Sequence, residues 1–447
     1  MTRQEVGANE FDHQFRTDFS PTSFDEEDGL FHDFLPFSDI SGWVPEGGIY
    51  EDVLRNTTLV RLGDIHALSF LSYVGPPPEH QYFLDFPHDR LDHSWVVAMT
   101  GQRILERNGF SKTRVDKAVM AFLLHDVGTP ALGDATMQVD PENLAEEEYW
   151  SEAAFKEGGR EILEKYGTDE LEIDSIIKNR GVLGQVLDIA DRITYTMKDL
   201  YSIISYGQTG RNEYTRDLYE VLDKFPDIGN VYKDVRIEGD RVYFTNPERL
   251  KAFLLLRAHL HQKLYLNPIS QGRDFLVRRL IEDAYSASGD PVKPLNPQNL
   301  REMGDEELQR ILFEWHKPQG DQAPYFLDSR GFFMGIVNWH PEYRQFESEE
   351  EAIAFQEKIG EDPNNIVLGI KKRRGFDPGT SYLVQDPQTG NILPLHDYDP
   401  EGSAKIEEIA ESLPGIFVYY KDLTQSSMEG RAEGVNTLLR HAFKKPQ

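Results

Sequence analysis

The segment AFLLHDVG places His125 and Asp126 side by side at the end of an apolar stretch with helical spacing, just before Gly128. Burying an unpaired carboxylate next to an imidazole costs several kcal/mol unless something compensates it, and a divalent cation is a natural compensation. A His-Asp pair that stands alone more often only caps a helix C-terminus. The pair therefore indicates a metal site only when other ligands accompany it.

Two other segments supply such ligands. The segment LDHS presents His93 on an earlier amphipathic stretch, and LDIADRITYTMKDL presents Asp191 and Asp199 on a later one. Because Asp191 and Asp199 are eight residues apart, a helix turns them to nearly the same face. Mixed imidazole and carboxylate ligands suit Mn, Fe, Co, Ni or Zn better than Ca, and the sequence does not choose among these metals or Mg.

The order His93, then His125 with Asp126, then Asp191 resembles the H…HD…D signature of the HD superfamily. The resemblance implies that these four residues bind a divalent metal. A metal held there would polarise a phosphoryl oxygen and activate a water near neutral pH. The expected activity is therefore that of a metal-dependent phosphohydrolase.

A closer resemblance begins before the first of these histidines. The blocks VRLGDIHALSFLSYV and FPHDRLDHSWVVA look like the opening of the deoxynucleoside triphosphate triphosphohydrolases, which include the bacterial dGTPases and the SAM-and-HD-domain dNTPase. In that family an Arg three residues before the first metal His contacts phosphate, and Arg90 has this position. The run DRITYTMKD also matches a family motif that begins at the last metal Asp. The match implies that Arg192 holds phosphate, Tyr195 packs on the sugar and Asp199 accepts a hydrogen bond from the 3′-hydroxyl.

A third block, LLLRAHLHQKLYLNP, resembles the family helix in which an Arg contacts the terminal phosphates and a Tyr eight residues later closes on the sugar. Arg257 and Tyr265 have that spacing. Guanidinium groups suit phosphate oxygens, and a Tyr ring can cover a flat sugar face. The segment 364–420 looks like the family's C-terminal lobe, so the resemblance spans roughly residues 52–435. We therefore expect a (deoxy)nucleotide to be the substrate or ligand.

The chain departs from this family directly after the His-Asp pair. The triphosphohydrolases continue with Gly-His-x-Pro-Phe-x-His, whereas HDVGTPALGD has Thr129 and Asp134 at the two histidine positions. Ser151 or Glu152 stands where a further family histidine would fall. The Gly-Asp pair that ends in Asp134 resembles HD-type 5′-nucleotidases instead. The catalytic candidates are Asp134 as general acid or base, Glu152 second, and the metal ligand Asp126.

Two other functions stay open at this point, and a third is disfavoured. The missing histidines leave room for a nucleotide-binding sensor or regulatory subunit with little catalysis, and the Gly-Asp pair leaves room for a 5′-nucleotidase. An HD-type diiron oxygenase would need two more histidines between the His-Asp pair and the final Asp, and no His lies between His125 and Asp191. The predicted function is dNTP triphosphohydrolase-like, with these as alternatives.

Composition sets the broad class. The 447 residues are 39% hydrophobic and 28% charged, which is typical of a globular protein, and they include no cysteine. A formal charge of −30 disfavours nucleic-acid polymers, although a few converging cations can still hold a nucleotide. No apolar run reaches the length of a membrane span, and the N-terminus does not resemble a secretory signal. We expect a cytoplasmic homo-oligomer that binds no membrane.

Helices must position these residues. Apolar residues three and four apart run through 53–71, 90–109 and 111–126, and further helical segments fall at about 148–166, 182–206, 247–266 and 271–288. Asn108-Gly109 is expected to end one helix, and Ser111 to cap the next. Later the period shortens to two in FFMGIVNW, NNIVLGIKK, TSYLVQD and PGIFVYY, around helices at 348–359 and 403–413. The expected fold is mainly α: an irregular N-terminal arm (1–51), an all-helical HD domain (52–317) and a small C-terminal α+β lobe (318–447).

Overall fold

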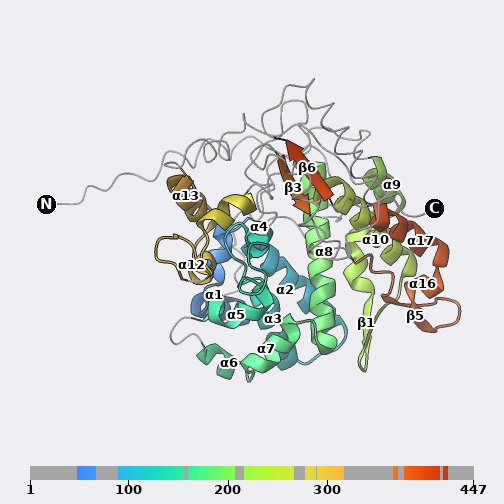
Figure 1. Cartoon of the computed structure of the whole chain (residues 1–447). Coiled ribbons are helices and arrows are strands. Elements are labelled where there is room, and N and C mark those ends of the chain that lie inside the picture. The colour runs from blue at the N-terminus through green and yellow to red at the C-terminus, as the bar shows by residue number, and fades with distance from the viewer. Residues whose placement is uncertain are drawn as a thin grey trace.

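The computed structural model describes residues 48–66, 89–155, 160–206, 216–265, 277–287, 289–316, 366–370, 377–412 and 416–420. Helices dominate these residues, as expected (Figure 1). The helices are α1 (Ile49–Asn56), η2 (Leu59–Asp64), α2 (Arg90–Arg107), α3 (Lys112–Leu124), α4 (Gly133–Met137), α5 (Glu146–Ala154), α6 (Glu161–Lys165), α7 (Glu170–Ile177), α8 (Gly181–Tyr206), α9 (Arg216–Lys224), η5 (Ile228–Asp234), α10 (Pro247–Leu260), η6 (His261–Tyr265), α12 (Pro297–Glu302), α13 (Asp305–His316), α16 (Leu395–Tyr398) and α17 (Pro400–Ser412).

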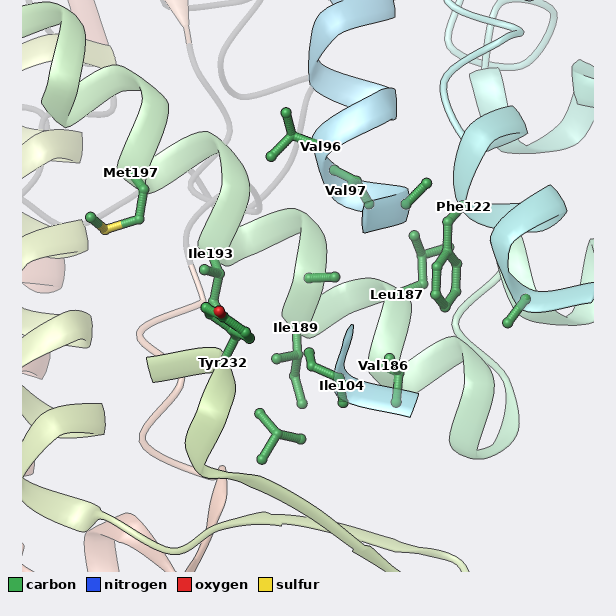
Figure 2. Close-up of a cluster of buried hydrophobic side chains, with 14 of the residues drawn as sticks. Val96, Val97, Ile104, Phe122, Val186, Leu187, Ile189, Ile193, Met197 and Tyr232 are labelled. Atoms are coloured by element: carbon green, nitrogen blue, oxygen red, sulfur yellow. The ribbon is translucent and has the colours of Figure 1, made fainter. Parts of the chain in front are cut away.

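Helix α2 packs against both α3 and α8, and these contacts form the centre of the core. Figure 2 shows their apolar side chains meeting, among them Val97 of α2, Phe122 of α3 and Leu187 of α8, all of them buried. Gly101 of α2 lies so close to the Phe122 ring that a Cβ there would overlap it. Each such buried side chain contributes roughly 1.5–3 kcal/mol of transfer free energy. The three helices that carry the predicted metal ligands are therefore held rigidly against one another.

The ends of α2 follow from local chemistry. Asp89 caps its start, because the carboxylate accepts the backbone N–H of Asp92 at 2.7 Å. The chain leaves α2 through Gly109, whose φ of +74° favours glycine, and the predicted helix end at Asn108-Gly109 is confirmed. Ser111 occupies the predicted cap position of α3, although its side chain makes no capping hydrogen bond.

The strands are β1 (Val235–Glu238), β2 (Arg241–Phe244), β3 (Ile366–Ile370), β4 (Leu383–Gln385), β5 (Ile392–Pro394) and β6 (Ile416–Tyr420). Four of them form one sheet in the order β1-β2-β4-β5, in which only β2 and β4 are parallel. The other two, β3 and β6, form an antiparallel pair with Leu368 opposite Val418. Strands β3, β4 and β6 lie within three of the predicted strand segments.

The β1–β2 hairpin lies within the segment 52–317, which the sequence analysis treats as all-helical, and that detail was wrong. Each of its strands has only four residues, too few for alternation to stand out. The hairpin is completed by pairing Tyr243 with Leu383 of the C-terminal segment. Helix α1 also begins three residues before the expected start of the domain. The boundary at 317/318, the strand at 332–339 and the helix at 348–359 lie outside the described residues.

The loop between α3 and α4 is held in place by a half-buried arginine. Arg61 of η2 donates hydrogen bonds to the carbonyls of Val127 at 2.9 Å and Thr129 at 2.7 Å, and to that of Met303 at 3.1 Å. Leu132, on the same loop, donates its N–H to the buried carboxylate of Asp305 of α13 at 2.6 Å. These bonds fix the segment that follows the His-Asp pair. Of the helices described, none is both long and apolar enough to cross a membrane.

Candidate metal centre

The predicted ligands from three segments converge. His93 lies in the first turn of α2, His125 follows the last residue of α3, and Asp191 lies midway along α8. The Nε2 atom of His93 is 2.9 Å from Oδ1 of Asp191, and Nε2 of His125 is 3.8 Å from the same oxygen. Candidate ligand atoms of these three residues all lie within 4.8 Å of one another. The three side chains thus form a cluster that could hold one divalent cation.

Asp126 borders the same cluster. Its Oδ1 is 3.3 Å from Nε2 of His125, and its Oδ2 is 3.8 Å from Nε2 of His93. Asp126 and His93 are buried, whereas the Asp191 side chain is about one-third exposed. The site is thus closed on the core side and reachable from the side of Asp191.

The orientation of His125 fits a metal. Its Nδ1 lies 2.8 Å from the carbonyl oxygen of Phe122, which leaves Nε2 directed at the carboxylates. That Nε2 is buried and makes no hydrogen bond of acceptable geometry. A bond from the second ring nitrogen to a carbonyl is the usual way in which proteins fix a metal-binding histidine. Two imidazole nitrogens and two carboxylates form a donor set suited to a transition metal.

Electrostatics point the same way. Burial alone would lower the pKa of the His125 imidazole, but the carboxylates of Asp126 and Asp191 raise it to about 9. Burial alone would raise the pKa of Asp191, but the neighbouring imidazoles of His125 and His93 hold it well below its ordinary value. The two carboxylates therefore stay charged and require a positive partner, which is either a proton on an imidazole or a metal ion.

Arg90 connects the cluster to a second set of acids. Its Nη1 donates to Oδ2 of Asp126 at 2.9 Å, and its Nη2 lies 3.5 Å from Oδ1 of Asp134. The carboxylate of Glu146 lies 3.9 Å from Nη1. Arg90 thus lies beside a predicted metal ligand. This position is compatible with the phosphate-binding role expected of Arg90. Asp134, the first candidate acid or base, is 60% exposed on α4.

Glu146 is a residue that the sequence analysis missed. It opens α5, and its carboxylate accepts a hydrogen bond from the Thr129 hydroxyl. A Cβ on Gly128 would collide with the backbone of Glu146, so this glycine permits the close approach. Burial, together with the charge of Asp126, raises the pKa of Glu146 to about 8 despite the opposing charge of Arg90. An acidic residue in the first turn of a helix is common, so nothing in EEEYW singles it out.

Glu152, the second catalytic candidate, does not reach this cluster. It lies on α5 with a side chain that is 70% exposed, and its carboxylate faces Arg301 at 3.9 Å. Ser151 donates to the carboxylate of Glu170 at 2.8 Å. On this helix, among the described contacts, Glu146 alone approaches Arg90. The expectation for Glu152 is therefore corrected in favour of Glu146, five to six residues earlier than the expected position.

The predicted sugar-binding residues meet farther along α8. The hydroxyl of Tyr265 donates a hydrogen bond to Oδ2 of Asp199, and Nε of Arg257 donates to the hydroxyl of Tyr195. The rings of Tyr195 and Tyr265 meet edge to face, with centroids 6.1 Å apart. Arg257 and Asp199 are buried. All four of these candidates therefore belong to one cluster, as their positions in the family motifs imply.

A π-helical turn places Tyr265 there. In a regular α-helix, residues eight positions apart point to the same broad side, within roughly 80° of each other. The chain instead continues from α10 into the π turn η6, which includes Tyr265. Such turns widen the helix locally and are frequent at functional sites. The turn thus changes the direction of Tyr265 relative to that of Arg257.

Arg192 lies on the exposed side of the same helix. Its Nε donates to Oδ1 of Asp188 at 2.9 Å, and its Nη1 donates to Oδ2 of Asp377 at 2.9 Å. Its guanidinium carbon lies 5.7 Å from the ring centre of Tyr382, whose hydroxyl donates to Asp188 at 2.9 Å. The C-terminal segment therefore contributes to this end of the site, which the sequence analysis did not anticipate.

Asp199→Asn is expected to change how stability depends on pH. Burial raises the pKa of Asp199 from 3.8 to about 7, despite the hydrogen bond from Tyr265 and the charge of Lys198. Because the folded state keeps a proton that the unfolded chain releases, the stability contributed by this group is complete below pH 3.8 and is lost as pH rises to about 7. The loss amounts to roughly 4 kcal/mol at most.

Asparagine carries no charge at any pH, so Asp199→Asn should gain stability relative to the natural protein between about pH 5 and about pH 8. Thermal unfolding measured at both pH values checks this. A melting temperature that changes in parallel for the two proteins would show that Asp199 has an ordinary pKa.

Comparisons with known proteins agree with this geometry. Residues 90–196 match the family model described as the HD domain. The matched segment starts at Arg90 and includes all four predicted ligands and Tyr195. No curated protein matches the chain. This segment is therefore similar to an HD domain, and the metal cluster lies inside it.

Solved structures share the fold across most of the chain. A phosphohydrolase from Bacteroides thetaiotaomicron superposes with a TM-score of 0.58 at 15% identity, covering 85% of this chain and 97% of that one. A hypothetical protein from Aquifex aeolicus gives a TM-score of 0.58 at 16% identity, covering 89% and 99%. At such identities the likeness concerns the fold and leaves the substrate open.

Proposed function

We propose that this protein is a metal-dependent phosphohydrolase that acts on (deoxy)nucleotides, in the manner of a dNTP triphosphohydrolase. The observation that carries the proposal is the convergence of His93, His125, Asp126 and Asp191, with the buried Nε2 of His125 directed into the cluster. The similarity of residues 90–196 to the HD domain and the fold shared with a phosphohydrolase support it.

These four residues would hold the cation. When bound, a divalent metal there supplies a Lewis acid for a phosphoryl oxygen and lowers the pKa of a water near it. The protein itself orients the donors: the carbonyl of Phe122 fixes His125, and Arg90 holds one oxygen of Asp126. The donor set leaves the choice among Mn, Mg, Fe, Co, Ni and Zn to experiment.

In this proposal three arginines bind the phosphates, and they lie on two sides of Asp191. Arg90 lies beside Asp126, whereas Arg192 and Arg257 lie toward the tyrosines of the sugar cluster. Arg192 follows Asp191 directly in α8, so its backbone lies next to that of a proposed metal ligand. Arginines that bind charge more tightly as it develops lower the barrier to phosphoryl transfer.

Tyr195 and Tyr265 would cover the sugar, with Asp199 as the hydrogen-bond acceptor for its 3′-hydroxyl. In the protein alone the Asp199 oxygen is engaged by the Tyr265 hydroxyl, so a sugar hydroxyl would join or replace that bond. This arrangement favours a ligand with a sugar over inorganic phosphate.

Two acids lie where a proton could be moved. Asp134 approaches Arg90 from the exposed side, and Glu146 approaches it from the buried side. Glu146, with its raised pKa, can hold a proton at neutral pH on a carboxylate that also accepts the Thr129 hydroxyl. Asp134 and Glu146 would supply the proton transfer that histidines supply in the dNTP triphosphohydrolases, which the sequence resembles.

Product analysis over a full panel of nucleotides tests the proposal. Each dNTP, rNTP and dNMP is incubated with the protein and Mn, Mg or Co, and products are separated by chromatography. Release of tripolyphosphate and a nucleoside is the expected result, and release of one phosphate from a dNMP would assign the 5′-nucleotidase alternative. Tight nucleotide binding without any product would instead support the sensor alternative, which the residues Thr129 and Asp134 motivate.

A further inference from the structure

The arginines proposed to hold phosphate away from the metal are both engaged by one acidic residue of the C-terminal segment. Nη1 of Arg192 donates to the Asp377 carboxylate at 2.9 Å. Nη1 of Arg257 donates to the main-chain carbonyl oxygen of the same Asp377. Two arginines from different helices thus bind one residue, but only Arg192 contacts its anionic carboxylate, as it would contact a phosphate oxygen, whereas Arg257 holds the main chain beside it.

The turn that carries Asp377 is built to keep it there. Its second carboxylate oxygen accepts the N–H of Gly379 at 2.9 Å. Gly379 has a φ of +74°, and a Cβ at this position would overlap side-chain atoms of Leu254 and Tyr382. Only glycine therefore allows the turn to lie this close to α10. Asp377 is fixed by the fold and not merely attracted to the nearest arginine.

The carboxylate is nevertheless open to competition. The Asp377 side chain is 55% exposed, whereas that of Arg192 is 18% exposed. Burial alone would raise the pKa of Asp377, but the N–H of Gly379 and the charge of Arg192 hold it below its ordinary value, so the group is an anion at neutral pH. A soluble phosphate can therefore exchange with it at Arg192 by a small movement of the carboxylate.

We propose that Asp377 is an affinity-determining residue of the substrate site, a resident anion whose carboxylate occupies the phosphate position at Arg192 until substrate phosphate displaces it. The proposal rests on the proposed function, because that function assigns the two arginines to phosphate. Displacing the Asp377 carboxylate from Arg192 costs the same free energy for every ligand whose phosphate binds there. Ligands whose phosphates do not reach Arg192 are therefore unaffected by Asp377.

Calorimetric titration with inorganic tripolyphosphate tests this directly. The full-length protein, as purified, is titrated at fixed salt with matched Mg²⁺ in both solutions. Asp377→Asn removes the charge but keeps an oxygen for the Gly379 N–H, and it should bind tripolyphosphate about tenfold more tightly. Asp386→Asn, in an exposed turn of the same segment, should bind as the natural protein does. Unchanged or weaker binding to Asp377→Asn at an unchanged melting temperature would overturn the proposal.

A double-mutant cycle ties the effect to its partner. In an Arg192→Ala background, Asp377→Asn should no longer strengthen binding, because the two residues act on one another. A gain that persists without Arg192 would count against the proposal. Asp377→Ser, which can still accept the Gly379 N–H, takes the place of Asp377→Asn should the latter fail to fold.

Failure of this proposal is separable from failure of the proposed function. The natural protein could hydrolyse nucleotides while Asp377→Asn binds tripolyphosphate no more tightly. That result would refute only the role of Asp377. If the natural protein neither hydrolyses nucleotides nor binds tripolyphosphate, the assignment of the arginines to phosphate binding would itself be refuted.

Discussion

Asp126→Asn is expected to lose metal loading and nucleotide turnover together, with turnover lower by on the order of 10³-fold. The Asp126 carboxylate approaches Nε2 of both His93 and His125, at 3.8 Å and 3.3 Å. Asparagine keeps the shape of the side chain but removes the charge that a cation needs. Metal content after loading and dialysis, measured by mass spectrometry beside kcat, checks both effects on the same sample.

The fold should survive this change, because Arg90 retains Asp134 at 3.5 Å and Glu146 at 3.9 Å as partners. Asp116→Asn is a matched control, since it removes a carboxylate charge from the neighbouring helix α3, where Asp116 pairs with the exposed Lys112. A variant that keeps its full metal content but loses turnover would place Asp126 in the chemistry instead of the ligand set. Retention of both properties would contradict the proposed site.

Glu146→Gln is expected to reduce kcat on the order of 10²-fold and to remove the fall in activity at alkaline pH. Glu146 is largely shielded from solvent, with a side chain that is 18% exposed, and its pKa of about 8 means that the carboxyl holds a proton below that pH and loses it above. If it donates that proton to the leaving oxygen, natural activity falls as pH rises through this value. A cation on Asp126 weakens the repulsion between the two acids, so the fall should lie at or below about pH 8.

The pH dependence of kcat from about pH 6 to about pH 10 measures this. Glu148→Gln is the control, because Glu148 is exposed on the same helix and pairs with Lys178. The loss caused by Glu146→Gln should shrink on the p-nitrophenyl ester of a nucleoside 5′-phosphate, whose leaving oxygen needs little protonation. An unchanged alkaline limb in the variant would show that another group, with Asp134 the first candidate, carries the proton.

Ligand positions on a single helix could be predicted from spacing. Asp191, Tyr195 and Asp199 are four residues apart in turn, so any straight helix turns them to one side, and α8 does. The apolar periods of α2, α3 and α8 also indicated three helices that would pack on one another. Once these helices pack, the side chains of His93, His125 and Asp191 are directed toward a shared point.

Contacts between segments far apart in the sequence could not be predicted in this way. Glu146 reaches Arg90 because Gly128 admits the start of α5, and such close approach leaves no periodic signal. The same holds for Asp377, which meets α8 and α10 only through tertiary packing. The β1–β2 hairpin is short and owes its place to pairing with β4. Local patterns describe helices well, but they carry little information on what packs at their ends.

A crystal structure of the protein soaked with Mn²⁺ tests the central claim most directly. The expected result is an anomalous peak within about 2 Å of Nε2 of His93 and His125 and of carboxylate oxygens of Asp126 and Asp191. An absence of any peak among these four side chains at saturating metal, or a peak bound by other residues alone, would contradict the account.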